Sequence, residues 1–322
     1  MGAVLKHPTV AFLSRRLLHS AVVLLGVLVV VFSLLQLVPG DPIRIALGTR
    51  YTEASYEALK SASGLDRPLL VQFFSYLGNS VTGDLGVSFR SGQPVTELLM
   101  NRLPATLSLA LVGIIIGLVI ALVVGIWAAL HEGTVSDAVV RIASQFGVSI
   151  PDFWMGLLLI TVFSATFHLL PSSGYVALTD DPWEWLRHII LPASAVGLVA
   201  GAILTRYVRS AVLEVVSMSY VRTAKSKGLS RRVVTFRHIV RNALIPVLTI
   251  AGIQFATILG GVIVVEVVFA WPGLGNLVYN AVATRDYPLI QGTVLLIAVM
   301  FLAVNLLVDM LYAVVDPRIR LS

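Results

Sequence analysis

The chain has 322 residues, of which 57% are hydrophobic and only 12% are charged, and its formal net charge is +6. Because a soluble domain carries roughly 25% charged residues, this composition excludes an ordinary soluble protein and places the chain in the membrane class. The positive charge does not indicate nucleic-acid binding, since the basic residues gather in loops between apolar runs, where they set the orientation of a membrane protein.

Six apolar runs are predicted to cross the membrane as helices. A helix needs about 20 apolar residues to cross the hydrocarbon layer. The runs cover residues 17–38, 104–130, 152–170, 188–208, 244–268 and 289–315. The first run follows a tail of residues 1–16. We interpret it as a retained helix rather than a cleaved signal peptide, because no Ala-x-Ala cleavage site follows it.

Residues 39–103 form the one sizeable region between the predicted membrane helices. Start and stop residues predict two short helices in this region. One runs from near Thr52 to Gly64, and the other from Asp66-Arg67-Pro68 to Gly78. These residues carry no recognisable chemistry.

Local features also mark the membrane runs themselves. The spacing Gly-x-x-x-Gly occurs at 113–117 and at 197–201, and it predicts close approach between helices. Pro151 is the natural break in the long stretch from 138 to 170. Asp152, beside it, is either a functional carboxylate within the membrane or an acid at the start of a helix, and we favour the helix-start interpretation.

Residues 209–243 form a polar, basic segment between the fourth and fifth runs, and nine Lys or Arg lie between 206 and 241. Ser219 is predicted to cap a short helix that ends at Gly228 in the left-handed conformation. Ser230 is predicted to cap a second short helix. That helix would place three apolar side chains on one face: Val233, Phe236 and Val240.

Positive charge in the short loops predicts the orientation of the chain. The basic segment lies on the same side as both termini if there are six crossings, and short loops rich in Lys and Arg stay in the cytoplasm. This makes residues 1–16 a cytoplasmic tail and residues 39–103 an external loop region. An alternative role for the basic segment is contact with anionic lipid headgroups.

The basic segment resembles a known motif. Arg222-Thr223-Ala224, followed by Gly228 and then by Leu244-Ile245-Pro246, is similar to the EAA loop of ABC importer permeases. Arg222 stands where the general pattern has Glu, and the gap between Gly228 and Pro246 is longer than in sugar permeases. Both departures are similar to the dipeptide/oligopeptide branch of the family.

Further segments extend the resemblance over nearly the whole chain. They are Gly83–Phe89, Val265–Gly275, Arg285–Pro288 and the terminal Asp316-Pro317-Arg318. Their joint order and spacing resemble the B-type permease of dipeptide/oligopeptide importers. The resemblance implies an all-α integral membrane protein with six transmembrane helices in the type I ABC importer permease fold. It also implies an external loop domain after the first helix and a permease core over residues 104–316.

The resemblance also implies a function and partners. The chain would form half of a translocation pore for dipeptides or oligopeptides, with haem, nickel or glutathione as further possibilities. It would pair with a homologous second permease, one or two ATPase subunits that hold ATP and Mg, and an external substrate-binding protein. The chain would lie in the inner membrane of a bacterial or archaeal cell, and it would itself carry no cofactor.

Residues 209–243 then become the cytoplasmic coupling loop, whose short helix docks on an ATPase subunit. The residues expected to act in coupling are Tyr220, Val221, Arg222, Thr223, Ala224 and Gly228. Tyr220, Val221 and Ala224 share one helical face, which is the predicted contact with the ATPase cleft.

The loop between the fifth and sixth runs, residues 266–288, combines apolar residues with turn residues. We favour an interfacial segment that anchors the two neighbouring helices, because Trp and Tyr prefer that zone. The sharper hypothesis is a contact with the binding protein that helps to release substrate. Its candidate residues are Trp271, Asn280, Arg285 and Asp286.

Two other classes of protein remain as alternatives. An ion-coupled secondary transporter would also be a helical bundle, although inverted repeats and central carboxylates are not evident. A membrane enzyme is disfavoured: His131-Glu132 lacks the second His of a zinc protease, no phosphate-binding Gly-Lys-Ser/Thr loop occurs, and the chain has no Cys. We therefore predict no catalytic residue and no metal ligand.

Overall fold

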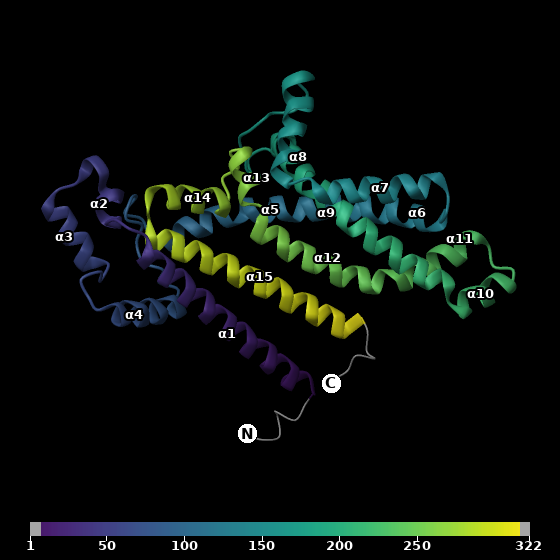
Figure 1. The fold of residues 1–322 in the computed structure, drawn as a ribbon, viewed down its shortest axis with the longest axis horizontal. Coiled ribbons are helices and arrows are strands. Elements are labelled where there is room, and N and C mark those ends of the chain that lie inside the picture. Colours follow the sequence, from purple (N-terminus) through teal and green to yellow (C-terminus); the bar gives the residue numbers. More distant parts are fainter. Residues whose placement is uncertain (1–7, 316–322) are drawn as a thin grey trace. The chain divides into compact units, whose positions relative to one another are not determined.

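The computed structural model describes residues 8–315, which are mostly helical (Figure 1). Within this range there is no β-strand, only an isolated bridge between Val87 and Pro94. Among the described residues, five helices are long and apolar enough to cross a bilayer, and a bent pair of helices brings the number to six if the pair is one crossing. The predicted all-α membrane architecture is confirmed.

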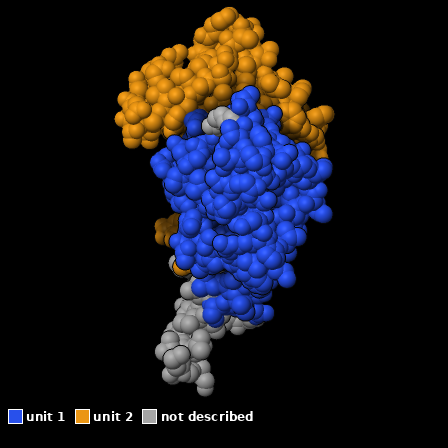
Figure 2. Space-filling view, turned by 90° about the vertical axis from the view of Figure 1, so that its left-hand side faces the viewer, with its two compact units in different colours: residues 1–106, 272–302 blue, residues 107–271, 303–322 orange. Residues whose placement is uncertain are grey.

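The described residues divide into two compact units, coloured separately in Figure 2. The first unit comes from residues 1–106 and 272–302, and the second from residues 107–271 and 303–322. Two helices, α5 (Val95–Ile120) and α15 (Tyr287–Val315), contribute residues to both units.

The first unit begins with the long apolar helix α1 (Pro8–Leu37). Besides parts of α5 and α15, its other helical elements are α2 (Pro42–Leu47), a 3₁₀ turn (Gly48–Arg50), α3 (Glu53–Ala62), α4 (Leu69–Thr82) and α14 (Leu274–Thr284). Thr52 caps α3 by accepting a hydrogen bond from the backbone N–H of Ser55, and Gly64 follows with a φ of +66°, so the predicted helix from Thr52 to Gly64 is confirmed.

The predicted end of the next helix at Gly78 is wrong. Helix α4 continues through Gly78 to Thr82 and ends at Gly83, whose φ of +84° is left-handed. A glycine inside a helix costs only about 1 kcal/mol relative to alanine, so its presence alone does not end one. The glycine that ends α4 is the one whose conformation other residues rarely adopt.

The second unit is built around α9 (Pro182–Ser217), which continues without a break beyond the predicted boundary at 208. Its other elements, besides the ends of α5 and α15, are the π-helical turn Ala121–Gly125, α6 (Ile126–Leu130), α7 (Val135–Ser149), α8 (Asp152–Leu159), the π-helical stretch Ile160–Thr166, α10 (Ser219–Ser226), α11 (Arg231–Val233), the π-helical stretch Val234–Val240, α12 (Arg241–Gly261) and α13 (Ile263–Val268).

Glycine contacts bring α5 and α9 together, as the Gly-x-x-x-Gly spacings predict. A Cβ atom on Gly197 would lie 2.8 Å from the carbonyl oxygen of Gly113, and one on Gly117 would lie 3.1 Å from the carbonyl oxygen of Gly197. Only residues without side chains allow two helix backbones to approach this closely. The break at Pro151 is also confirmed, because α7 and the helix that starts at Asp152 meet at 103°.

Candidate functional site

Helix α10 lies within the predicted coupling loop and begins differently from the prediction. Met218 occupies the N-cap position in an extended conformation, no side chain caps the helix, and Ser219 is its first residue. The prediction of Ser219 as the cap is therefore wrong. The prediction for Gly228 is confirmed, because its φ is +76°. The short helix is thus closed at its C-terminal end by a left-handed glycine.

The face of α10 that was expected to enter an ATPase cleft is mostly buried in this chain. Val221 is 0% exposed and Ala224 is 6% exposed, because α10 packs on α9 and on the stretch 234–240. This burial contradicts the prediction of Val221 and Ala224 as contact residues, whereas Tyr220 is exposed. The outward-facing side chains of α10 include Arg222, Thr223, Lys225 and Ser226.

Tyr220 ties α10 to the helix that follows it. The Tyr220 hydroxyl donates a hydrogen bond to the carbonyl oxygen of His238 at 3.3 Å and accepts one from the Asn242 side-chain amide at 2.9 Å. The same amide donates to the His238 carbonyl oxygen at 2.8 Å. Sequence reasoning missed Asn242, because it lies 22 positions from its partner and belongs to no local motif.

The predicted second short helix is not separate. Residues 231–261 form one continuous helix of 31 residues that passes through α11, the π-helical stretch and α12. Ser230 does occupy the N-cap position, although its side chain makes no capping hydrogen bond. Val233 and Phe236, two of the three apolar side chains expected on one face, are exposed, and the buried side chains of this stretch are Val234, Thr235 and Ile239.

Asp286, one of the predicted binding-protein contacts, is instead buried and links distant parts of the first unit. Its carboxylate is 1% exposed. It accepts hydrogen bonds from the Ser88 hydroxyl at 2.5 Å, from the Phe89 N–H at 3.1 Å and from the Arg90 N–H at 3.4 Å. The aspartate therefore holds the loop before α5 against the start of α15.

The other three candidates of that loop lie in different environments. Trp271 is fully buried in the second unit, where its ring packs edge-on against Tyr175 with centroids 4.7 Å apart. Arg285 has a left-handed φ of +53° and donates a hydrogen bond to the carbonyl oxygen of Pro39. Asn280 is exposed on α14. Burial of Trp271 and Asp286 contradicts their prediction as surface contacts.

A buried ion pair between Asp137 and Arg209 was missed by sequence reasoning. Asp137, in the first turn of α7, is 0% exposed, and Arg209 of α9 reaches it with Nε at 2.6 Å and Nη2 at 2.9 Å. The carboxylate also accepts a hydrogen bond from the Gly133 N–H at 3.2 Å. This bidentate ion pair, together with the hydrogen bond from Gly133, holds the turn before α7 against α9.

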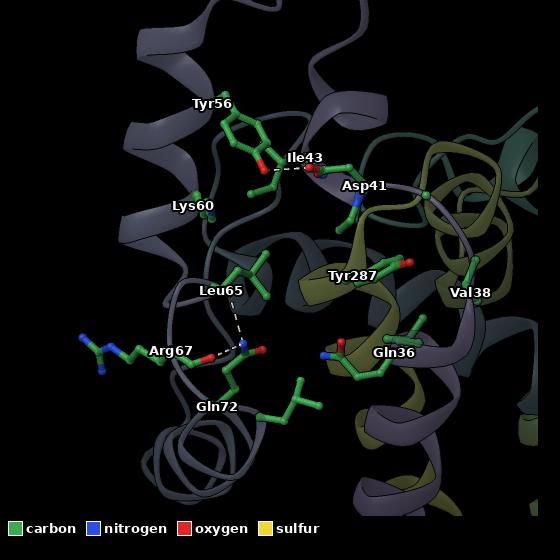
Figure 3. Close-up of a pocket in the computed structure, with 14 residues that line it drawn as sticks. Gln36, Val38, Asp41, Ile43, Tyr56, Lys60, Leu65, Arg67, Gln72 and Tyr287 are labelled. Atoms are coloured by element: carbon green, nitrogen blue, oxygen red, sulfur yellow. Dashed lines mark hydrogen bonds between the residues drawn. The ribbon is translucent and has the colours of Figure 1, made fainter.

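A cavity of about 510 Å³ lies in the first unit, among α1, α2, α3, α4 and the start of α15 (Figure 3). The Tyr56 hydroxyl donates to the Asp41 carboxylate at 2.7 Å on one wall. On another wall the Gln72 amide donates to the backbone oxygens of Leu65 and Arg67 at 3.3 and 2.8 Å. These bonds stabilise the wall itself.

Asp152 is the first residue of α8, where the helix dipole favours an acid. Among residues 8–315, no group of three His, Asp or Glu side chains is arranged to hold a metal ion.

Comparison with known proteins identifies the family. Residues 9–110 match the N-terminal model, and residues 121–321 the main model, of the binding-protein-dependent transport system inner membrane component. A putative peptide transport system permease protein of Brucella abortus strain 2308 is 41% identical over 310 residues, covering 96% of this chain and 99% of the relative. The oligopeptide transport system permease protein AppB of Bacillus subtilis strain 168 is 40% identical over 313 residues, covering 96% and 99%.

A solved structure supports the same fold. A chain of the inward-facing MetNI methionine ABC transporter matches with a TM-score of 0.55 and 19% identity, over 68% of this chain and 96% of that one. The two family models together cover most of the sequence. This chain therefore belongs to the binding-protein-dependent transport system inner membrane components, the permease family of ABC importers with the type I fold.

Proposed function

We propose that this chain forms half of the translocation pore of an ATP-driven importer for dipeptides or oligopeptides. The observation that carries the proposal is about 40% identity, over 96% of the chain, to permeases named for peptide and oligopeptide transport. Haem, nickel and glutathione are the competing substrates. The proposed partners are a second permease, one or two ATPase subunits that bind ATP and Mg, and a substrate-binding protein.

The decisive experiment uses the complex purified through a tag on this chain and reconstituted in proteoliposomes. We expect uptake of a labelled peptide that requires ATP and the binding protein and is inhibited by vanadate. Uptake driven by an ion gradient without ATP would instead support a secondary transporter. If haem, nickel or glutathione is accumulated and peptide is not, the substrate class of the proposal is wrong.

Helix α10 is the proposed coupling element, with its contact on the outward face that carries Arg222, Thr223 and Lys225. The support is its anchorage within the chain: α10 follows α9 directly, packs on it, and is hydrogen-bonded through Tyr220 to the helix that continues into α12. A displacement of α10 would therefore reach two membrane helices. Val221 and Ala224 act as packing residues in this proposal, and Gly228 closes the helix.

A bulky substitution on the outward face tests the coupling proposal. Thr223→Trp should abolish ATP-driven uptake and weaken copurification of the ATPase, while membrane insertion persists. The matched control is Val135→Trp, because Val135 is 81% exposed at the start of α7, in another turn that we assign to the cytoplasm. Full uptake by the Thr223 variant would refute docking on this face.

The proposed orientation places α10 and both termini in the cytoplasm and residues 39–103 outside. The absence of Cys makes the test clean, since each introduced Cys is the single thiol of the chain. Ser226→Cys should react with an impermeant maleimide only from the cytoplasmic face of sealed vesicles, and Ser63→Cys only from the external face. Both side chains are exposed. Reaction of both from the same face would overturn the orientation.

The loop that contains α14 is the proposed contact with the binding protein, restricted to exposed side chains such as Asn280. Asn280→Arg should reduce the stimulation of ATP hydrolysis by the binding protein and leave basal hydrolysis unchanged. Unchanged stimulation would favour the alternative, in which this loop anchors the neighbouring helices at the membrane interface.

A further inference from the structure

Helix α4 has an apolar face that its own chain leaves uncovered. The helix (Leu69–Thr82) contains no charged residue and none of its residues is buried. Leu70, Phe74 and Val81 are 73%, 64% and 82% exposed, and their spacing of four and seven residues places them on one side. An uncovered apolar stripe of this kind marks a contact surface.

The opposite side of α4 is polar. Ser75 and Asn79 are exposed there, and Gln72 uses its side-chain amide to bind the backbone of Leu65 and Arg67. The helix is therefore amphipathic along its whole length. At 1.5 Å per residue its 14 residues extend about 21 Å, which is too short to cross about 30 Å of hydrocarbon.

A contact with α1 fixes where α4 lies relative to the membrane. Phe73 of α4 packs edge-on against Phe32 of α1, with ring centroids 5.4 Å apart. Phe32 lies five residues before the end of the membrane-spanning stretch Ser14–Leu37, which corresponds to about 7.5 Å along the helix axis. A crossing that ends at the membrane surface near Leu37 would place this part of α4 where headgroups meet acyl chains.

We propose that α4 is an interfacial helix, with its Leu70–Phe74–Val81 face among the lipid acyl chains and its Ser75–Asn79 face turned away from them, toward the pocket that Ser75 and Asn79 line together with Gln36 of α1. Amphipathic helices with this division of side chains lie flat at the boundary of the bilayer. A protein partner is disfavoured because the face offers no charge or hydrogen-bonding group and adjoins α1, itself an apolar helix with very few buried residues. The first charged residues on either side, Arg67 and Asp84, lie beyond its ends.

Residues 39–103 then do not form a freely exposed loop domain. Helix α4 ties them to the membrane surface beside α1, and α2 and α3 are held at a fixed height above the lipid. Gln36 near the end of α1 and Gln72 of α4 both line the cavity in Figure 3, so the proposal places this cavity at the membrane surface.

The test uses single Cys variants in the assembled complex in proteoliposomes. Phe74→Cys and Val81→Cys probe the apolar face, and Ser75→Cys and Asn79→Cys are matched controls on the same helix. Each variant is labelled with an environment-sensitive nitrobenzoxadiazole maleimide. Quenching is then measured with nitroxides attached near the top of the acyl chains and with a water-soluble quencher.

We expect blue-shifted emission and several-fold stronger quenching by lipid nitroxides at positions 74 and 81 than at 75 and 79, with the opposite order for the aqueous quencher. Equal access of the aqueous quencher to all four positions would overturn the proposal. Protection of positions 74 and 81 from both quenchers would also overturn it, because a protein partner would then cover this face.

Discussion

Helices α1 and α9 are both apolar enough to cross a membrane, yet their surroundings are opposite. The most apolar window of α1 has a mean hydropathy of 2.6 and only 6% of its residues are buried, whereas the window of α9 has a lower hydropathy of 1.9 and 67% of its residues are buried. Hydropathy thus indicates membrane residence and does not rank burial within the fold. The lipid tails of a bilayer are as apolar as a leucine side chain, so apolar character alone does not drive one helix against another. Helices that pack closely in a membrane are enriched in small residues, which let their backbones approach.

The small residues of the two helices account for the difference. Gly197 and Gly201 of α9 contact the backbone of α5, whereas the space around Gly26 of α1 is open, and a Cβ atom added there would meet no atom within 4 Å. Pairs of substitutions, one at a buried and one at an exposed position, test this contrast.

The largest effect on stability is expected at the Asp137–Arg209 ion pair. Arg209→Ala leaves a buried carboxylate without its bidentate partner and should lower the free energy of unfolding by about 3 kcal/mol, the low end for breaking a buried pair, because Arg209 keeps some exposure. Arg44→Ala is the matched change in the first unit. Arg44 and Asp41 are 4.0 Å apart, and Arg44 is largely and Asp41 partly exposed, so the expected cost is about 0–1 kcal/mol.

Thermal unfolding of the solubilised complex measures this difference, and Asp137→Asn with Arg209→Ala completes a double-mutant cycle. Additive effects in the cycle would mean that the two side chains do not act together. Equal losses for Arg209→Ala and Arg44→Ala would break the contrast between the buried and exposed positions.

The second effect concerns two residues of one loop. Asp286→Ala removes the acceptor of three hydrogen bonds from the segment Ser88–Arg90 and should cost about 1.5–3 kcal/mol, the range for hydrogen bonds to a charged group. Asn280→Ala, on the exposed face of α14, should change stability by less than about 0.5 kcal/mol. Hydrogen exchange of residues 83–94 should quicken only in the Asp286 variant, and unchanged exchange there would refute its role as an anchor.

The third effect separates the two kinds of glycine. Gly197→Leu would force α9 away from the backbone of α5 and should cost about 1–3 kcal/mol, as overpacking does. Gly26→Leu places the same side chain in open space and should be neutral or slightly stabilising, because leucine is the better helix former. A stable Gly197 variant with normal assembly would show that the α5–α9 contact accommodates a leucine side chain at little cost in stability.

Sequence reasoning succeeded where a single residue imposes a conformation. Pro151 breaks a helix because its ring excludes the preceding turn, and Gly228 adopts a φ of +76° as expected. It failed where local signals compete. Gly78 and Gly83 are both glycines that could end a helix, and only Gly83 does so.

Contacts between distant residues could not be predicted from one sequence. Ser88 and Asp286 are 198 positions apart, and Asp137 and Arg209 are 72 apart. In a sequence, a carboxylate near a helix end looks the same whether it caps the helix, forms an ion pair or contacts another protein. For this reason Asp286 was predicted to lie at the surface. Burial of Val221 and Ala224 was missed for a related reason, since an amphipathic helix shows which side is apolar but not what covers it.

The smallest expected effect is a pH dependence of stability at Asp41, a member of the more exposed Asp41–Arg44 pair. Partial burial raises the pKa of Asp41, but hydrogen bonds from Tyr56 and from the N–H groups of Arg44 and Ile43 outweigh it, so the pKa lies below its ordinary value. A lowered pKa stabilises the fold above the unfolded pKa of about 3.9. That contribution is lost as the pH falls through the folded value.

Tyr56→Phe removes one of those hydrogen bonds and so measures how much the Tyr56 hydroxyl contributes to the lowered pKa of Asp41. At neutral pH the variant should lose up to about 1 kcal/mol locally, because the carboxylate is partly exposed. Its further loss on acidification should be smaller than in the unmodified chain, since less of the folded-state advantage of the charged carboxylate remains to be lost. Exchange of the amides of α2 and α3, compared at about pH 6 and about pH 3, measures both quantities on either side of the ordinary carboxyl pKa. The same acid sensitivity in both chains would mean that Tyr56 does not set the pKa of Asp41, and that the hydrogen bonds within the cap of α2 do so alone.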